Sequence, residues 1–199
     1  MSKVVCNIAA SLDGYVAGLN QSLEHPLGVG AERVLHTWMF DAAEENADEL
    51  AEITDAGAFI MGRNMFGPVR GEWEGDWRGW WGEEPPYHGP VFVLTHHERA
   101  PLPMDGGTTF HFVTGGIDEA LGRAREAAGE RNVSVAGGAS TVNQFLAADL
   151  LDELHLHIAP VLLGAGERLF EGVGRTALDQ VGARQTSLVT HLRYAVRRG

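Results

Sequence analysis

Strand-like and helix-like segments alternate along this chain, and that order limits the folds it can adopt. In "VSVAGGASTVNQFL", residues 133–146, an apolar β-type run meets Gly137-Gly138, and a helical run begins at Ala139. Further β-type runs occupy residues 4–9, 58–61, 91–94, 109–113 and 153–158, and helical patterns occupy residues 41–55 and 117–128. The last part, about 177–198, contains two segments typical of paired strands. We therefore expect an α/β fold with a mostly parallel central sheet flanked by helices and a C-terminal antiparallel edge hairpin.

Length and composition restrict the number of domains and the range of partners. A chain of 199 residues is expected to fold as one domain, here residues 1–199. The formal net charge of −12 argues against nucleic acid or an acidic membrane surface as a partner. We find neither a signal-like start nor a long apolar run, so we expect a cytoplasmic protein. The single cysteine, Cys6, excludes an intrachain disulfide, and we expect no bound metal.

Two long segments, residues 18–36 and residues 67–90, lack a clear strand or helix pattern. The second segment carries four of the five tryptophans, which are Trp73, Trp77, Trp80 and Trp81. Loops of this length are usually functional or mobile. Because large aromatic side chains are costly to expose, we expect the tryptophans to pack either as a lid over a site or against a second subunit. A homodimer is therefore one of the two expected arrangements.

Polar residues follow several of the expected strands directly. Asp13 follows the first strand, and Arg63 and Thr95-His96-His97 follow the next two. Ligands of open α/β sheets bind at the carboxyl ends of the strands, where such residues meet. The Arg63 guanidinium could bind a phosphate through two hydrogen bonds. Asp13 could act as an acid or simply stabilise a turn.

The glycine pair at residues 137–138 has two interpretations. It could form a tight turn, or it could let a phosphate approach the N–H groups at the start of a helix. The dinucleotide fingerprint G-x-G-x-x-G does not match here, nor does it match in full at Gly164-x-Gly166. A standard Rossmann domain is therefore disfavoured.

Five segments in a fixed order resemble the dihydrofolate reductase fold. They are "NIAASLDGYVAG", "FIMGRNMFG", "VFVLTHH", "VSVAGGASTVNQFL" and "LHIAPVLLGAGERLF". The chain is most similar to the branch typified by the C-terminal reductase domain of the bifunctional riboflavin-biosynthesis deaminase–reductase and its stand-alone relatives. The resemblance covers nearly the whole chain, and each motif is short.

This resemblance implies NADPH binding and hydride transfer. It implies that the nicotinamide contacts the backbone of Ala9, Ala10, Val16 and Ala17. It places the cofactor phosphates near Gly62, Arg63 and Asn64, the adenosine 2′-phosphate near Thr95, His96 and His97, and the pyrophosphate against Gly137, Gly138, Ala139, Ser140 and Thr141. The basic groups would then cluster locally in an otherwise acidic protein.

A shared fold does not identify the substrate of this protein. Dihydrofolate reductases carry an acidic residue on the first helix near the pterin, and here the corresponding position falls near Asn46. We therefore expect a small heteroaromatic or sugar-linked carbonyl or imine substrate, with Asp13 as candidate proton donor and with Phe66 and Trp73 near the substrate. Three alternatives stay open: a true dihydrofolate reductase, a flavin-linked reductase, and an NADPH-binding sensor or dimeric scaffold without turnover.

Overall fold

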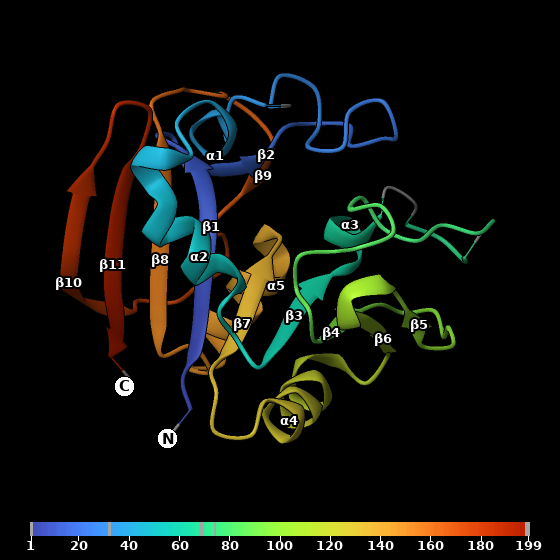
Figure 1. Ribbon diagram of the computed structural model, residues 1–199. Coiled ribbons are helices and arrows are strands. Elements are labelled where there is room, and N and C mark those ends of the chain that lie inside the picture. Colours follow the sequence, from blue (N-terminus) through green and yellow to red (C-terminus); the bar gives the residue numbers. More distant parts are fainter. Residues whose placement is uncertain (1, 32, 68–69, 74, 198–199) are drawn as a thin grey trace.

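The computed structural model describes residues 2–31, 33–67, 70–73 and 75–197, and its centre is a nine-stranded sheet (Figure 1). The strands are β1 Val4–Ser11, β2 Tyr15–Ala17, β3 Ala58–Gly62, β4 Pro90–Leu94, β5 Leu102–Pro103, β6 Thr109–Val113, β7 Val133–Gly137, β8 Glu153–Ala159, β9 Glu167–Arg168, β10 Ala177–Gln185 and β11 Thr190–Arg197. The α-helices are α1 Thr37–Asp41, α2 Ala47–Thr54, α3 Arg63–Phe66, α4 Gly116–Ala128 and α5 Ala139–Ala147, with 3-10 turns at Glu44–Asn46 and Asp105–Gly107.

The main sheet has the strand order β10-β11-β8-β1-β7-β3-β4-β6-β5, and β2 pairs with β9 in a separate small sheet. The strands from β8 to β6 run parallel, whereas β5, β11 and β10 are antiparallel to their neighbours. The sheet and its C-terminal hairpin confirm the expected dihydrofolate reductase-like fold class. The parallel arrangement brings the carboxyl ends of β1, β3, β4 and β7 to one edge.

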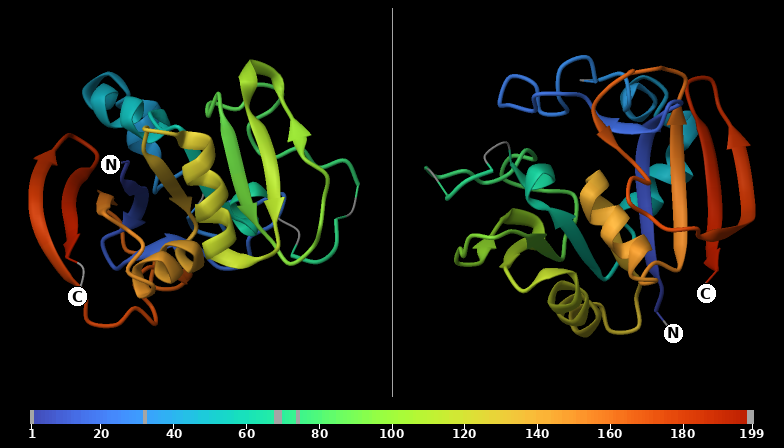
Figure 2. Two further views of the ribbon diagram at one scale, coloured as in Figure 1. Left: turned by 90° about the horizontal axis from the view of Figure 1, so that it is seen from below. Right: turned by 180° about the vertical axis from the view of Figure 1, so that it is seen from behind.

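Helices cover the two faces of the sheet unequally (Figure 2). Helices α4 and α5 pack on one face, where they share an apolar core with β1, β7 and β8. On the other face, α2 lies over β10 and β11, to which it is joined by ion pairs. The remaining half of that face, on β3, β4 and β6, is covered by the tryptophan-rich segment, whose Trp73, Trp77 and Trp81 pack against the core. These three tryptophans are therefore partly buried against their own chain.

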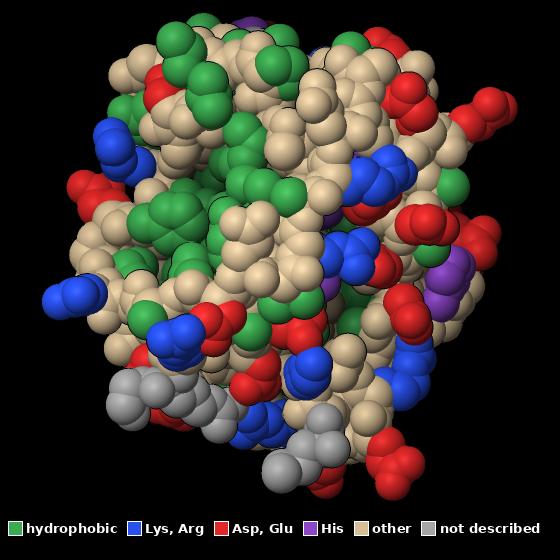
Figure 3. Space-filling model, turned by 90° about the vertical axis from the view of Figure 1, so that its left-hand side faces the viewer, with side chains coloured by type: hydrophobic (Ala, Val, Ile, Leu, Met, Phe, Trp, Pro, Cys, Tyr) green, Lys and Arg blue, Asp and Glu red, His purple; other side chains and the backbone are tan. Residues whose placement is uncertain are grey.

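One side of the hairpin is left partly uncovered. Ile158, Leu192, Tyr194 and Val196 alternate along β8 and β11 and are only partly buried. Figure 3 views the molecule from the β10 side and shows hydrophobic side chains gathered in a hollow there. The expected homodimer stays a prediction, and this partly exposed apolar face is one surface that such a contact could cover.

The helix expected at residues 41–55 is interrupted. Helix α1 ends at Asp41, and α2 begins at Ala47 after a 3-10 turn. The cause is Asn46, whose side-chain amide donates to the Ala42 carbonyl at 2.7 Å and so competes with the helical backbone bond. The helices are short, and none among the described residues is long and apolar enough to cross a membrane.

Candidate functional site

The sequence motifs predicted to bind a dinucleotide meet at the carboxyl edge of the parallel strands. A Cβ added to Gly62, at the end of β3, would lie 2.7 Å from Thr141 Oγ1 at the start of α5. A Cβ added to Gly137 would lie 3.4 Å from the side chain of Ile8 in β1. Three segments far apart in the sequence, which are β1, the end of β3 and the β7–α5 junction, therefore converge at a common edge, as the strand order requires.

The glycine pair joins β7 to α5 and leaves room for a ligand. Gly137 has a φ of +122°, which favours glycine, and the Gly137–Gly138 peptide is cis. Nothing lies within 4 Å of a Cβ built on Gly138, so no packing inside the protein requires glycine there. The first turn of α5, at Ala139, Ser140 and Thr141, has no side-chain cap and no acidic residue. Its N–H groups and partial positive charge suit an anion.

Beside this edge, two arginines enclose one tryptophan. The guanidinium carbon of Arg63 lies 3.1 Å from the centroid of the Trp73 ring, and that of Arg99 lies 4.9 Å from it. Arg63 donates to Thr95 Oγ1 at 3.2 Å, and Trp73 Nε1 donates to the His97 carbonyl at 2.9 Å. The predicted residues Arg63, Thr95 and His97 are therefore brought together, and Arg99 joins them without having been predicted.

The arginine cluster carries positive charge with few partners. Burial, together with the neighbouring Arg99, lowers the pKa of Arg63, and burial also lowers the pKa of Arg99. Buried nitrogens of Arg63, Arg78 and Arg99 lack a hydrogen-bond partner. Among the described residues, no carboxylate lies within ion-pairing distance of Arg63 or Arg99. Asp76 lies close enough to oppose the lowering of the Arg99 pKa, but it forms no ion pair with either arginine, and two like charges held together favour an incoming anion such as a phosphate.

The Asp13 carboxylate holds the loop that follows β8 through hydrogen bonds. Its carboxylate accepts hydrogen bonds from the backbone N–H groups of Leu163 at 3.1 Å and Gly164 at 2.7 Å, and another from Ser11 Oγ. The bond from Ser11, assisted by those backbone donors, lowers the pKa of Asp13 to about 2. The group is thus an ionised acceptor at neutral pH, which suits positioning of a loop better than donating a proton.

The other predicted residues lie near this edge with different exposure. Ala9, Ala10, Val16 and Ala17 are buried in β1 and β2. Asn64 follows Arg63 in α3, and His96 is exposed just after β4. Phe66 is fully buried and packs edge-on against Trp73, Phe110 and Phe112. Its ring therefore belongs to the core, behind Trp73.

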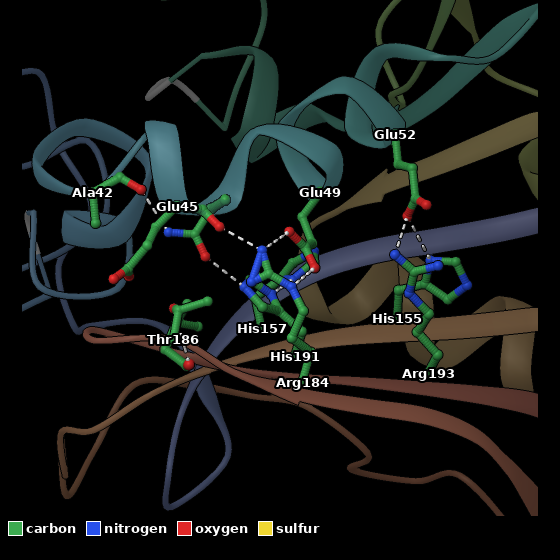
Figure 4. A network of polar contacts seen from close by, with 12 residues as sticks. Ala42, Glu45, Glu49, Glu52, His155, His157, Arg184, Thr186, His191 and Arg193 are labelled. Carbon is green, nitrogen blue, oxygen red and sulfur yellow. Dashed lines mark hydrogen bonds and ion pairs between the residues drawn. The ribbon is translucent and has the colours of Figure 1, made fainter.

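A second polar cluster was not predicted. Asn46, His157 and His191 are buried and hydrogen-bonded in series, between α2 and the strands β8 and β11. Figure 4 shows the histidines beside the ion pair of Glu49 with Arg184. The sequence alone placed His155 and His157 on one face of a strand. It gave no sign of His191, the hydrogen-bond partner of His157, which lies 34 residues further along the chain.

Comparison with known proteins agrees with this geometry. Residues 2–192 match the sequence family described as the RibD C-terminal domain. The protein YwjB of Bacillus subtilis (strain 168), which is described as uncharacterized, is 34% identical over 84 residues, which cover 42% of this chain and 48% of YwjB.

Two solved structures share the fold. A putative riboflavin biosynthesis protein from Shewanella sp. PV-4 superposes with a TM-score of 0.67 at 23% identity, covering 98% of this chain and 99% of that one. A pyrimidine reductase-like protein from Corynebacterium diphtheriae gives a TM-score of 0.61 at 17% identity, covering 100% and 93%. With a family match over nearly the whole chain, the protein belongs to the RibD C-terminal domain family, whose members resemble riboflavin-pathway reductases.

Proposed function

We propose that this protein is an NADPH-dependent reductase that transfers a hydride to a small heteroaromatic or sugar-linked carbonyl or imine compound. The observation that carries the proposal is the Arg63–Trp73–Arg99 cluster, which lies at the edge shared with the Gly137–Gly138 pair. Among the described residues it concentrates cations that form no ion pair, in a chain whose net charge is −12. Such a local cluster can bind a polyanion that the protein as a whole would repel.

The residues fit the parts of the cofactor in order along the edge. Arg63, Arg99 and the Thr95 hydroxyl would hold the 2′-phosphate, and the start of α5 would hold the pyrophosphate. The open space at Gly138 would let the phosphates lie against the backbone. Ala9 and Ala17 would border the nicotinamide, which supplies the hydride when the cofactor is bound. Asp13 would position the loop at Leu163 and Gly164.

The test compares two cofactors that differ only in the 2′-phosphate. Wild-type protein should bind NADPH more tightly than NADH in a fluorescence titration. The substitutions Arg63→Ala and Arg99→Ala should each weaken NADPH at least tenfold, since each removes a charge-assisted contact worth about 1.5–3 kcal/mol. NADH affinity should change less than threefold. Arg123→Ala, which removes an exposed arginine of α4, is the control.

Equal losses for NADPH and NADH would contradict the phosphate assignment. Turnover is then measured as NADPH oxidation with a panel of aminopyrimidines, small imines, quinones and dihydrofolate. If the protein binds NADPH tightly but turns over none of these compounds, a sensor or scaffold is favoured. Rapid turnover of dihydrofolate would favour a true dihydrofolate reductase, despite Asn46 at the position near which those enzymes carry an acid.

A further inference from the structure

A single aromatic ring contacts both arginines of the arginine cluster. The guanidinium carbon of Arg63 lies over the Trp73 ring, 3.1 Å from its centroid, and that of Arg99 lies 4.9 Å from the same centroid. A guanidinium that stacks on a ring uses its flat face, whereas its N–H donors point outward in the plane of the group. The ring can therefore hold a positive charge in place without using the donors that a phosphate needs.

The Trp73 ring is itself held by three elements of the fold. Its Nε1 donates to the carbonyl of His97, just after β4, at 2.9 Å. The ring of Phe112 in β6 packs edge-on against it with centroids 4.8 Å apart, and the ring of Phe66 in α3 does so at 5.8 Å. The tryptophan-rich segment thus places this ring against the sheet, next to the two charges.

Each arginine is tied to the protein by a hydrogen bond and keeps further donors. Arg63 donates to Thr95 Oγ1 at 3.2 Å, and Arg99 donates to the Trp77 carbonyl at 2.7 Å. A guanidinium has five N–H donors. Within the described part of the chain, Arg63 Nε and Arg99 Nη1 have no hydrogen-bond partner. Two cations with donors to spare suit the several acceptor oxygens of a phosphate monoester.

A cavity of about 450 Å³ lies beside Arg99, so a ligand has room next to the stack. Its lining consists of Arg99, Phe112 and Thr114, together with Glu98, Ala100 and Glu119. Asp76 also lies near enough to affect the pKa of Arg99. Carboxylates therefore surround the cavity, and each is a potential ion-pair partner for an arginine side chain that can turn toward it.

These carboxylates give the stack on Trp73 a second role. Glu119 pairs with Arg123 at 3.3 Å, and in the described residues neither Arg63 nor Arg99 forms an ion pair. An arginine that pairs with a carboxylate of its own chain is neutralised and attracts a phosphate less strongly. By holding the guanidinium faces, the ring keeps both charges out of such pairs.

We propose that Trp73 is a positioning residue that makes the arginine cluster selective for a phosphate monoester on a ribose, and so for NADPH over NADH. Trp73 holds Arg63 and Arg99 apart from the surrounding carboxylates, with donors available to the 2′-phosphate. Its effect is on the choice of cofactor and not on the hydride step. This role of Trp73 rests on the proposed NADPH-dependent function.

The first test measures the ratio of the NADH and NADPH dissociation constants in variants of Trp73. Trp73→Leu removes the aromatic face and should lower this ratio by about fivefold or more relative to the wild type. Trp73→Phe keeps an aromatic face, loses the hydrogen bond to His97, and should restore part of the ratio.

Trp80→Leu is the matched control. Trp80 lies in the same segment, is half-buried like Trp73 and packs edge-on against Trp77, whereas no described arginine lies over its ring. The ratio in this variant should stay within about twofold of the wild type.

The two cofactors separate a positioning role from a structural one. If Trp73 only supported the fold, its loss would weaken NADPH and NADH alike and leave the ratio unchanged, and that result in folded Trp73→Leu would overturn the proposal. A wild-type protein that binds neither cofactor, or binds both equally, would contradict the proposed function, and the role of Trp73 with it.

The second test uses the wild-type sequence labelled with 5-fluorotryptophan. The ¹⁹F signal of Trp73 is the one that is missing from labelled Trp73→Phe. Saturating adenosine 2′,5′-bisphosphate should shift this signal at least twice as far as saturating 5′-AMP, which lacks only the 2′-phosphate. Equal shifts, or no shift with the bisphosphate, would refute the role of Trp73. This test decides the matter if Trp73→Leu does not fold.

Discussion

Lowering the pH should destabilise the fold through His157. In the folded protein the pKa of this histidine is lowered to about 3, chiefly by burial, whereas an unfolded histidine titrates near 6.5. The unfolded chain therefore binds more protons between these two values, and stability rises with pH across that window. The contribution of His157 is fully present above pH 7 and is lost progressively as the pH falls from about 6.5 toward 3.

The magnitude follows from the two pKa values. At pH 5 the unfolded histidine is almost fully protonated and the folded one is not. This difference lowers the free energy of unfolding by about 2 kcal/mol relative to pH 7.5. His36, whose pKa is lowered to about 4 by burial, adds a loss of the same sign. The wild-type free energy of unfolding should thus fall by more than 2 kcal/mol over this interval.

Urea denaturation at pH 7.5 and pH 5.0 measures the effect. His157→Asn should lose about 2 kcal/mol less than the wild type between these two pH values, whatever its stability at pH 7.5. His155→Asn should show a smaller difference, because Glu153 and Glu52 oppose the lowering of the His155 pKa by burial. If wild type and His157→Asn lose the same free energy, His157 is not a buried neutral histidine.

Three further predictions test the local geometry. Gly166→Ala should unfold at a temperature several degrees lower, because its φ is +144° and a Cβ would collide with the Ala17 carbonyl; Gly164→Ala, with free space around it, should cost only about 1 kcal/mol. Gly138→Asp should abolish NADPH binding in calorimetry with little change in melting temperature, since the new carboxylate has room but would repel the pyrophosphate. Asp13→Asn should speed amide exchange at Gly164 by weakening its hydrogen bond, and unchanged exchange would contradict that assignment.

The fold could be predicted because its signals are local. Each parallel strand of the sheet is a short apolar run, and α4 and α5 show helical spacing next to glycines, so the order of these elements was visible before any contact was known; the short elements β2, β5, β9, α1 and α3 were not predicted. Observed boundaries at β3, β6 and α4 differ from the expected ones by one residue at most. Parallel pairing then follows from the alternation of strands and helices.

The side-chain clusters could not be predicted in the same way. The bond between His157 and His191 joins residues 34 positions apart, and that between His191 and Asn46 spans 145 positions. No spacing rule connects such pairs, because they depend on strand register and on the break between α1 and α2. That break is itself caused by the Asn46 side chain. The helix was therefore wrongly expected to be continuous at the place where the polar cluster forms.

The order of strands gives the two clusters complementary positions. The cationic cluster follows β3 and β4, the histidines of the second polar cluster lie on β8 and β11, and β1 and β7 separate them. From β1 to β4 the sheet crosses three strand spacings, about 14 Å. A dinucleotide with its 2′-phosphate at Arg63 and Arg99 would then run along the edge past the Gly137–Gly138 pair, and its nicotinamide would reach Ala9. Its reactive face would meet the uncharged groups beside His157. On our proposed function, the cationic half of this edge would therefore hold the phosphates, and the nicotinamide would lie toward the half that borders the buried histidines.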